Sequence, residues 1–266
     1  MHRIRIGGVP EHFNMPWYIG INNGLFQAEG IDIEWTDFPS GTGAMVKALE
    51  NNELDIAIML TEGTVSAIKH GAEICIINWY ITTPLVWGIH VASHASIYDL
   101  SDIFRRKYAI SRLGSGSHLM AKVHAQILCK SISDSQWKIV NNLSGAVEAL
   151  TKGEADVFFW EKFTSMPWVD KGVFRRIGEF PTPWPCFVIA SRVDYLQNNK
   201  SIINTLQKVL HGITQNIKSI RELDFAIATR YQLPENQVLE WLKTVEWQTK
   251  PNFNPDELSI VERYLA

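Results

Sequence analysis

The sequence predicts an α/β fold of two lobes, each a mainly parallel sheet flanked by helices, with a cleft between the lobes. Short apolar, strand-like runs alternate with helix-period segments, and this alternation is typical of parallel sheets covered by helices. One pattern also recurs: the segment 46–56 returns as 147–157 at a constant spacing of 101 residues. Both copies predict a helix end, a turn and a buried strand. They indicate two similar lobes, although βαβ proteins in general reuse this pattern.

The strands follow from the spacing of apolar residues. Ile4 and Ile6 alternate with arginines, which is the period of a half-buried strand. Leu143, Val147 and Leu150 instead have helical spacing and separate two strand-like runs. The expected strands are 3–9, 31–38, 54–60, 74–80, 85–92, 107–111, 137–141, 155–160 and 188–191.

The tail from Ser201 onward is predicted to be mostly helical. Its apolar residues share one face of a helix, which indicates a stripe packed against a core. The residues of this stripe are Leu206, Val209, Ile213, Ile217 and Ile220.

Composition excludes some functions. Of the 266 residues, 46% are hydrophobic and 20% are charged, so the chain can bury ordinary globular cores. A net charge of −3 argues against a nucleic-acid surface, which needs a basic excess. No apolar run approaches the roughly 18 residues that cross a bilayer. We expect neither a nucleic-acid partner nor a membrane span.

The start of the chain and the cysteines bear on localisation. Residues 1–7 are strand-like and lack the apolar run of a secretory signal. We therefore expect a cytoplasmic protein, or a periplasmic one if a leader has been removed. Cys75 and Cys186 lie in strand-like runs and Cys129 in a helix-like segment, so buried free thiols are expected.

The fold predicts where a ligand binds. In open parallel sheets, ligands bind beyond the carboxyl ends of the strands. Three loops in each lobe qualify, and they line one cleft if the lobes face each other. These loops are 9–14, 39–43 and 61–64 in the first lobe, and 113–118, 141–144 and 160–164 in the second.

Two of these loops are rich in glycine and hydroxyl groups. Ser40 and Thr42 precede one helix, and Ser115 and Ser117 precede another. Glycine allows the backbone to approach a ligand closely, and helix-start N–H groups donate hydrogen bonds to an acceptor. The alternative is that these serines and threonines are ordinary N-caps.

Carboxylates and aromatic rings give the candidate site its character. Glu11, Glu62 and Glu161 either bond to helix N-termini, worth about 0.3–1 kcal/mol each, or accept hydrogen bonds from an amine-bearing ligand. Nearby aromatic residues favour a flat, nitrogen-containing ring. The complete set of expected ligand-binding residues is Glu11, His12, Phe13, Asn14, Ser40, Thr42, Thr61, Glu62, Tyr80, Ser115, Ser117, His118, Trp160, Glu161 and Trp184.

The two histidines in these loops predict no metal centre. His12 and His118 lack the short spacing to other ligands that metal sites show, so neutral hydrogen-bonding histidines are expected. No Ser-His-Asp or Cys-His set can be assigned from sequence order. We expect no catalytic residues, no metal and no cofactor.

Several segments resemble a known family. The segments 24–33 (GLFQAEGIDI), 48–57 and 96–100 are similar to those of the type II periplasmic binding proteins, and the similarity runs from Arg3 to about Arg192. The nearest branches bind nitrate, sulfonates, taurine and thiamine-pyrimidine precursors. Residues 10–13, 60–62, 111–117, 159–165 and 182–184 resemble a narrower branch with bacterial and fungal members that lack an export signal.

The resemblance implies a domain plan and a function. It implies a discontinuous first lobe, 1–92 plus 184–266, around a second lobe, 93–183, joined by crossovers near 89–94 and 180–184. It implies a protein that closes on a small solute, as the binding component of an ABC permease or as a cytosolic relative, but it does not imply which solute the narrower branch binds. The acids and aromatic rings of the loops lead us to expect a flat nitrogen-containing or amine-bearing solute such as a pyrimidine, and we expect a monomer. An enzyme acting on a small cyclic acid or a pyrimidine, and a ligand-free regulatory module, remain alternatives. The cysteine-rich motif of the pyrimidine-synthesising fungal relatives is absent, so their chemistry is not implied.

Overall fold

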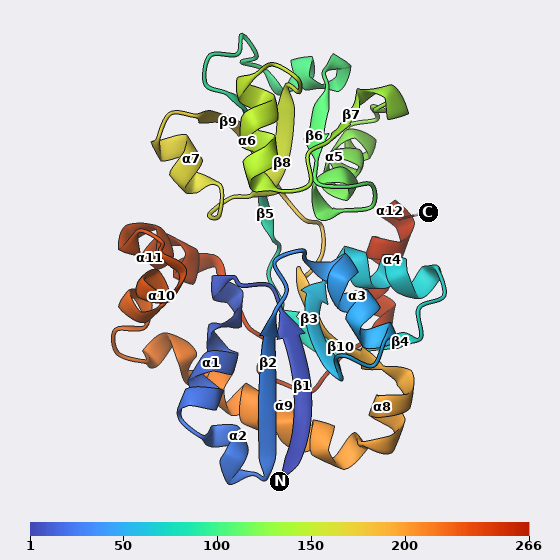
Figure 1. The fold of residues 1–266 in the computed structure, drawn as a ribbon, viewed down its shortest axis with the longest axis vertical. Helices are drawn as coiled ribbons and strands as arrows, with labels where there is room; N and C mark the ends of the chain where they lie inside the picture. Colours follow the sequence, from blue (N-terminus) through green and yellow to red (C-terminus); the bar gives the residue numbers. More distant parts are fainter. Residues whose placement is uncertain (266) are drawn as a thin grey trace. The chain divides into compact units, whose positions relative to one another are not determined.

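The chain divides into two compact units. The computed structural model describes residues 1–265. Unit 1 comprises Met1–Thr83 and Trp184–Leu265, and unit 2 comprises Pro84–Pro183. Each unit contains one five-stranded sheet with helices packed on it (Figure 1). The α/β fold class is confirmed.

The expected boundary at residue 92 differs from the structure. The strand β5 (Val86–Ala92) pairs with β8 (Val157–Glu161) and β9 (Phe174–Pro181), both in unit 2. The first crossing between units therefore lies at Thr83–Pro84, before β5, and not near residues 89–94. The second crossing lies at Pro183–Trp184, inside the expected range.

The sheet of unit 1 has the strand order β2-β1-β3-β10-β4. The strands β1 (His2–Gly8), β2 (Ile31–Asp37) and β3 (Ile56–Leu60) run parallel. The strand β10 (Phe187–Arg192) returns after unit 2 and pairs antiparallel with β3 and with β4 (Ile74–Ile81). The sheet is therefore mixed, and it is completed by a strand from a distant part of the sequence.

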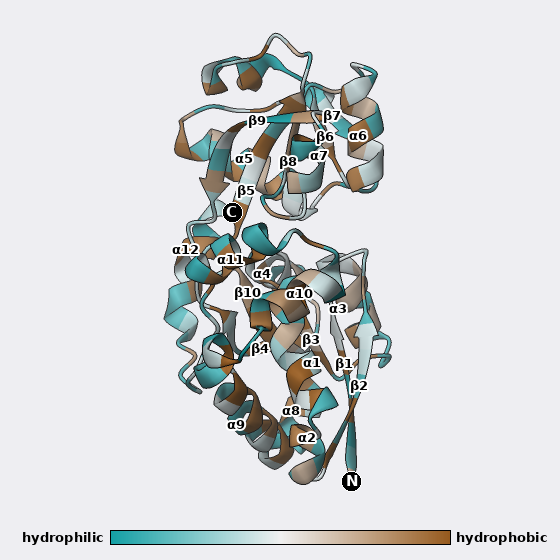
Figure 2. Cartoon of the chain, turned by 90° about the vertical axis from the view of Figure 1, so that its left-hand side faces the viewer, coloured by the Kyte–Doolittle hydropathy of each residue, from teal (hydrophilic) through white to brown (hydrophobic). Residues whose placement is uncertain are grey.

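Helices cover both faces of this sheet. The helices α3 (Thr42–Glu50) and α4 (Thr61–Lys69) cover one face, where Met45, Leu49, Ala57 and Met59 belong to one buried cluster. The other face carries α1 (Met15–Asn22), α2 (Leu25–Ala28) and α9 (Lys200–Asn216). The helix α9 carries both hydrophobic and hydrophilic residues along its length, as an amphipathic helix does (Figure 2).

The C-terminal part of unit 1 is helical, as predicted. It contains α8 (Val193–Asn198), α10 (Leu223–Tyr231), α11 (Glu235–Thr244) and α12 (Ser259–Tyr264), with short 3-10 helices η4 (Ile217–Ser219) and η5 (Pro255–Leu258). Leu206, Ile213 and Ile217 of the predicted stripe are buried, and Val209 is half-buried. Ile220 is 40% exposed, so the stripe was predicted one turn too long: α9 ends at Asn216.

The sheet of unit 2 has the order β7-β6-β8-β5-β9. The strands β6 (Tyr108–Ile110), β7 (Trp137–Ile139) and β8 run parallel, whereas β5 is antiparallel to β8 and β9. The helix α5 (Gly116–Ile127) packs on β8 and β6 on one face, and α6 (Leu143–Thr151) and α7 (Met166–Asp170) lie on the other. The 3-10 helices η2 (Leu100–Arg105) and η3 (Asp134–Gln136) lie in connections.

One strand was missed from the sequence. The strand β9 reads FRRIGEFP, and its arginines, glycine and glutamate interrupt the apolar pattern. It lies at the edge of the sheet and pairs only with β5, where polar residues are tolerated.

The repeated pattern corresponds to a repeated structure. In unit 1 it covers the end of α3 and the start of β3, and in unit 2 the end of α6 and the start of β8. Asn52 and Gly153 occupy equivalent positions and both have left-handed φ, of 58° and 69°. The same sharp turn therefore connects helix to strand in both units.

The three cysteines are free thiols, as expected, but they differ in exposure. Cys186 is buried and Cys75 is half-buried. Cys129 is exposed, contrary to the prediction, because it follows the end of α5 in a left-handed turn with φ of 53°. No helix in residues 1–265 has the length and apolar character needed to cross a membrane.

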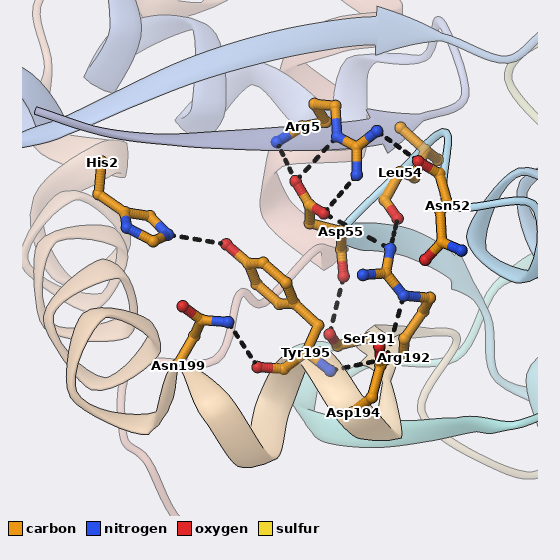
Figure 3. Close-up of polar contacts among 10 residues, drawn as sticks. All are labelled: His2, Arg5, Asn52, Leu54, Asp55, Ser191, Arg192, Asp194, Tyr195 and Asn199. Carbon is orange, nitrogen blue, oxygen red and sulfur yellow. Dashed lines mark hydrogen bonds and ion pairs between the residues drawn. The ribbon is translucent and has the colours of Figure 1, made fainter.

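A buried carboxylate joins the strands of unit 1 (Figure 3). Asp55 precedes β3, and its Oδ2 accepts hydrogen bonds from the backbone N–H of Arg5 at 2.9 Å and from Arg5 Nε at 3.1 Å. Its Oδ1 accepts from Arg5 Nη2 at 2.7 Å and from Arg192 Nη1 at 3.5 Å. Ser191 donates to the carbonyl of Asp55 at 2.7 Å. The start of β3 is thus tied to β1 and to the returning strand β10.

We expect Asp55→Asn to lower the free energy of unfolding at neutral pH by about 2–4 kcal/mol, because it removes the charge that two arginines surround. Burial favours the neutral acid, but the bonds from Arg5 and the nearby Arg192 leave the pKa of Asp55 below its ordinary 3.8. This stabilisation is therefore complete above pH 3.8 and is lost as the pH falls through the lower native pKa. Urea unfolding at about pH 7 and about pH 3 measures both effects.

The matched control is Asp32→Asn. Asp32 pairs with Arg3 on the same sheet, but the two side chains are 36% and 69% exposed. Its removal should change the unfolding free energy by less than about 0.5 kcal/mol. Equal losses for both variants would contradict the role given to Asp55.

Candidate functional site

In each unit, the candidate site lies where parallel strands end. In unit 1, β1 leads into the 3-10 helix η1 (His12–Asn14), β2 into the loop 38–41, and β3 directly into α4. In unit 2, β6 leads into the loop 111–115 before α5, and β8 ends at Glu161.

The loop after β1 is an aromatic cluster. The ring of His12 stacks on Phe13 at 4.7 Å between centroids and contacts the edge of Trp241 at 4.1 Å. Burial lowers the pKa of His12 to about 3, so this ring is neutral at physiological pH. The carbonyl of Phe13 accepts hydrogen bonds from Tyr80 Oη at 2.7 Å and Trp247 Nε1 at 2.9 Å. The Tyr80 hydroxyl therefore holds the loop in place.

Other expected residues of unit 1 also bond within the protein. Asn14 donates to the carbonyl of Val9 at 2.7 Å, and Thr42 Oγ1 accepts from the N–H of Leu60 at 3.2 Å. Thr61 donates to the carbonyl of Pro185 at 2.5 Å. Glu11 is half-buried at the start of its loop, and Ser40 is exposed. These bonds fix the ends of β1 and β3.

Glu62 is the most unusual group in unit 1. Its side chain is fully buried in the first turn of α4, and Oε2 accepts a hydrogen bond from Trp184 Nε1 at 3.0 Å. Oε1 has no hydrogen-bond partner within residues 1–265. Burial raises the pKa of Glu62 to about 7, against the effect of its backbone N–H and of Trp184. Near neutral pH, both the protonated and the ionised form of Glu62 are therefore populated.

Trp184 and the helix α12 pack near the helix that carries this carboxyl. Trp184 is 2% exposed, and its ring lies 6.1 Å from that of Tyr264. Tyr264 belongs to α12, which packs against α4. The fold brings Glu62 and Trp184 together although they are 122 positions apart in the sequence. Their direct hydrogen bond was not predicted from the sequence.

In unit 2, the loop after β6 is held by its own hydroxyls. Ser117 Oγ accepts from the N–H of Ser111 at 3.0 Å, and Ser115 Oγ donates to the carbonyl of Arg112 at 2.6 Å. His118 Nδ1 accepts from the N–H of Gly114 at 2.9 Å, and burial together with Lys122 lowers its pKa. The hydroxyl pattern thus shapes the loop that leads into α5.

Glu161 caps the loop after β8. Its Oε2 accepts hydrogen bonds from the N–H groups of Phe163 at 3.0 Å and Thr164 at 2.7 Å. Burial raises the pKa of Glu161, although these bonds oppose the rise. The sequence allowed two roles for this glutamate: bonding to backbone N–H groups or to a ligand. Oε2 has the first role.

Trp160 and Glu161 are not brought together. Successive residues of a strand point to opposite faces of the sheet. Trp160 stacks on Phe158 at 5.1 Å and packs against the core cluster beneath α6. Glu161 instead lies opposite Trp87 of β5. Trp87 was missed from the sequence because a tryptophan in an apolar strand looks like any core residue.

The described residues offer no metal centre: within residues 1–265 there is no group of three or more histidine, cysteine or carboxylate side chains that could hold an ion. What the two loop sets do offer is two buried carboxyls, one in each unit, each beside an indole. This chemistry suits hydrogen bonding to a small polar molecule.

Comparisons with known proteins agree with the fold. Residues 1–79 match a family model described as NMT1-like, and residues 87–180 match one described as Ca3427-like PBP. The Candida albicans CA3427 gene product, described as having the generic periplasmic binding protein fold, is 27% identical with a TM-score of 0.93. The alignment covers 100% of this chain and 89% of that one.

Two bacterial binding proteins share the fold at lower identity. The periplasmic aliphatic sulphonate-binding protein SsuA from Escherichia coli is 16% identical, with a TM-score of 0.78 over 99% of this chain and 90% of that one. PhnD1 from Prochlorococcus marinus, solved with methylphosphonate, is 10% identical, with a TM-score of 0.66 over 98% and 96%. No curated protein matches the chain. The predicted resemblance to type II periplasmic binding proteins is confirmed.

The raised pKa of Glu62 predicts how stability depends on pH. Between pH 4.5 and about 7 the native state keeps a proton that the unfolded chain releases, so this group makes stability fall as the pH rises through that window. Glu62→Gln removes the effect. We expect the variant to gain on the order of 2–3 kcal/mol relative to the parent between pH 4.5 and 8 in urea unfolding.

Glu50→Gln is the control, because Glu50 is exposed at the end of α3. Other titrating groups are common to the parent and both variants and cancel in the difference. A gap between Glu62→Gln and the parent that stays constant with pH would show that Glu62 is ionised throughout.

Proposed function

We propose, from the type II periplasmic binding protein fold of this chain, that it binds one small, flat, nitrogen-containing solute such as a pyrimidine and closes on it. The solute would contact the loops at the carboxyl ends of the strands in both units. The observation that carries this proposal is Glu62, a fully buried carboxyl whose Oε1 has no partner within residues 1–265. A buried polar atom that lacks a protein partner is rare and calls for an explanation.

The surroundings of Glu62 support a nitrogen-bearing solute. The fixed bond from Trp184 to Oε2 leaves Oε1 as the atom that can meet an amino group or a protonated ring nitrogen. Glu161 supplies a second buried carboxyl, at the end of the corresponding strand in unit 2. Two acids oppose a simple oxyanion when they are ionised and desolvated. A neutral heterocycle with N–H groups avoids that repulsion.

What the protein does with the bound solute is predicted from the family resemblance. An ABC permease is the proposed partner if the protein acts outside the cytoplasm, and a sensing role is proposed if it acts within it. A monomer is expected in either case.

The first test is a thermal-shift screen of aminopyrimidines, other flat nitrogen heterocycles, amino acids, sulfonates and nitrate. A ligand that binds only the folded protein stabilises it by about 2.7 kcal/mol at a hundredfold excess over Kd. For a chain of this size the melting temperature should rise by about 5–10 °C. The heterocycles should give the largest shift, and X-ray scattering should show compaction with the same compound. A larger shift with nitrate or a sulfonate would contradict the class of solute proposed.

The second test measures affinity in carboxyl variants by calorimetry. With the best compound from the screen, Glu62→Gln and Glu161→Gln should each weaken binding by about 1.5–3 kcal/mol, the range for hydrogen bonds to charged groups. The loss for Glu62→Gln should be larger at pH 8 than at pH 6, because the pKa of Glu62 near 7 leaves the parent carboxyl more often ionised at pH 8. Glu50→Gln should bind like the parent. Unchanged affinity in both site variants would show that Glu62 and Glu161 do not bind the solute and serve only the structure.

A further inference from the structure

Trp87 and Glu161 lie side by side at one edge of the sheet in unit 2. They are opposite each other in the antiparallel pair of β5 and β8, at the carboxyl end of β8. Residues so paired lie on the same face, with Cβ atoms about 4.5–5.5 Å apart. Phe159 lies on this face two residues earlier, and its ring is 5.5 Å from that of His124 on α5. The pair therefore lies on the α5 side of the sheet.

The two side chains offer complementary hydrogen-bonding atoms. Trp87 is 4% exposed, and its indole Nε1 is buried without a hydrogen-bond partner in the described part of the chain. Glu161 uses Oε2 for two backbone N–H groups, and Oε1 takes part in neither bond. An unsatisfied buried donor thus belongs to the residue paired with Glu161, whose Oε1 is not used in the two backbone bonds.

The lack of a partner for Trp87 points to a ligand. Buried indole N–H groups normally find an acceptor, and leaving one unpaired is unfavourable. An anion could accept from Trp87, but Glu161 on the next strand would repel it. A neutral group that accepts from Trp87 and donates to Glu161 satisfies both residues at once.

We propose that Trp87 and Glu161 together recognise one edge of the solute, on which an N–H group stands directly beside an acceptor nitrogen. The N–H group donates to Glu161 Oε1, and the ring nitrogen accepts from Trp87 Nε1. A 4-aminopyrimidine has such an edge. This inference rests on the proposed solute-binding function and narrows the solute to amidine-like heterocycles.

The experiment compares three flat compounds that are uncharged at neutral pH. 4-Aminopyrimidine carries both groups, pyrimidine carries the acceptor alone, and aniline carries the donor alone. Affinities are measured by ligand-detected NMR titration on the full chain. The parent should bind 4-aminopyrimidine about 5–10-fold more tightly than aniline and about 10–100-fold more tightly than pyrimidine.

Two variants remove one group each. Trp87→Phe keeps a ring but loses the N–H, so its preference for 4-aminopyrimidine over aniline should disappear. Glu161→Gln can keep its carbonyl oxygen on Phe163 and Thr164 and then presents an amide NH2, so its preference for 4-aminopyrimidine over pyrimidine should disappear. Trp168→Phe, on α7 at the opposite face, is the control and should keep both preferences. Urea unfolding establishes that each variant is folded.

The outcomes separate this inference from the function on which it rests. If each variant loses only its own preference, the donor–acceptor pair is supported. If both variants bind 4-aminopyrimidine with the preferences of the parent, the donor–acceptor pair is wrong and the binding of a flat nitrogen heterocycle stands. If the parent has no preference and MOPS or methylphosphonate instead raises the melting temperature of the parent and both variants equally, the pair and the proposed class of solute are both wrong, and only the binding of a small molecule stands. If no compound of any class binds the parent, both fail.

Discussion

The alignment of the strands in unit 1 depends on the carboxylate of Asp55. It receives the backbone and side chain of Arg5 from β1 and the side chain of Arg192 from β10, so three strands take their register from one buried charge. β3 begins one residue later and ends where Glu62 enters α4. The bonds of Asp55 at the start of β3 therefore also fix the position of Glu62, which follows the end of this strand. Asp156 repeats part of this arrangement in unit 2, where it accepts from the N–H of Lys107 at 2.9 Å.

The buried polar groups of the candidate sites are of two kinds: some hold the loops in place, and others have an atom without a hydrogen-bond partner. Most hydroxyls in the loops are committed: Ser115, Ser117, Thr42 and Thr61 bond to neighbouring backbone and hold the loops rigid. Within residues 1–265, Glu62 Oε1 and the Trp87 N–H are buried without a hydrogen-bond partner. Rigid loops around a few unsatisfied atoms are what a preorganised binding site requires, because less conformational freedom is lost when the solute arrives.

The sequence was most informative where the pattern is local. The apolar periodicity located nine of the strands. The spacing of 101 residues located a turn that is present in both units, and its equivalent residues Asn52 and Gly153 both have left-handed φ. It failed where tertiary context decides. β9 is polar because it is an edge strand, and β5 belongs to unit 2 because of its partners, which no local pattern reveals. Trp160 was grouped with Glu161 although alternate residues of a strand face opposite ways, and Trp87 gave no signal until its neighbours were known.

The insertion of β10 between β3 and β4 has a consequence for biosynthesis. During translation, β3 and β4 emerge more than 100 residues before Phe187, so one side of each stays without its partner while the whole of unit 2 is made. Unit 2 is continuous and can collapse as soon as Pro183 has left the ribosome. Unit 1 must bring together ends that are far apart in the chain, which slows folding and leaves strand edges open to other chains. In the nascent N-terminal segment, the edges of β3 and β4 that later pair with β10 are therefore exposed to association with other chains until β10 is made.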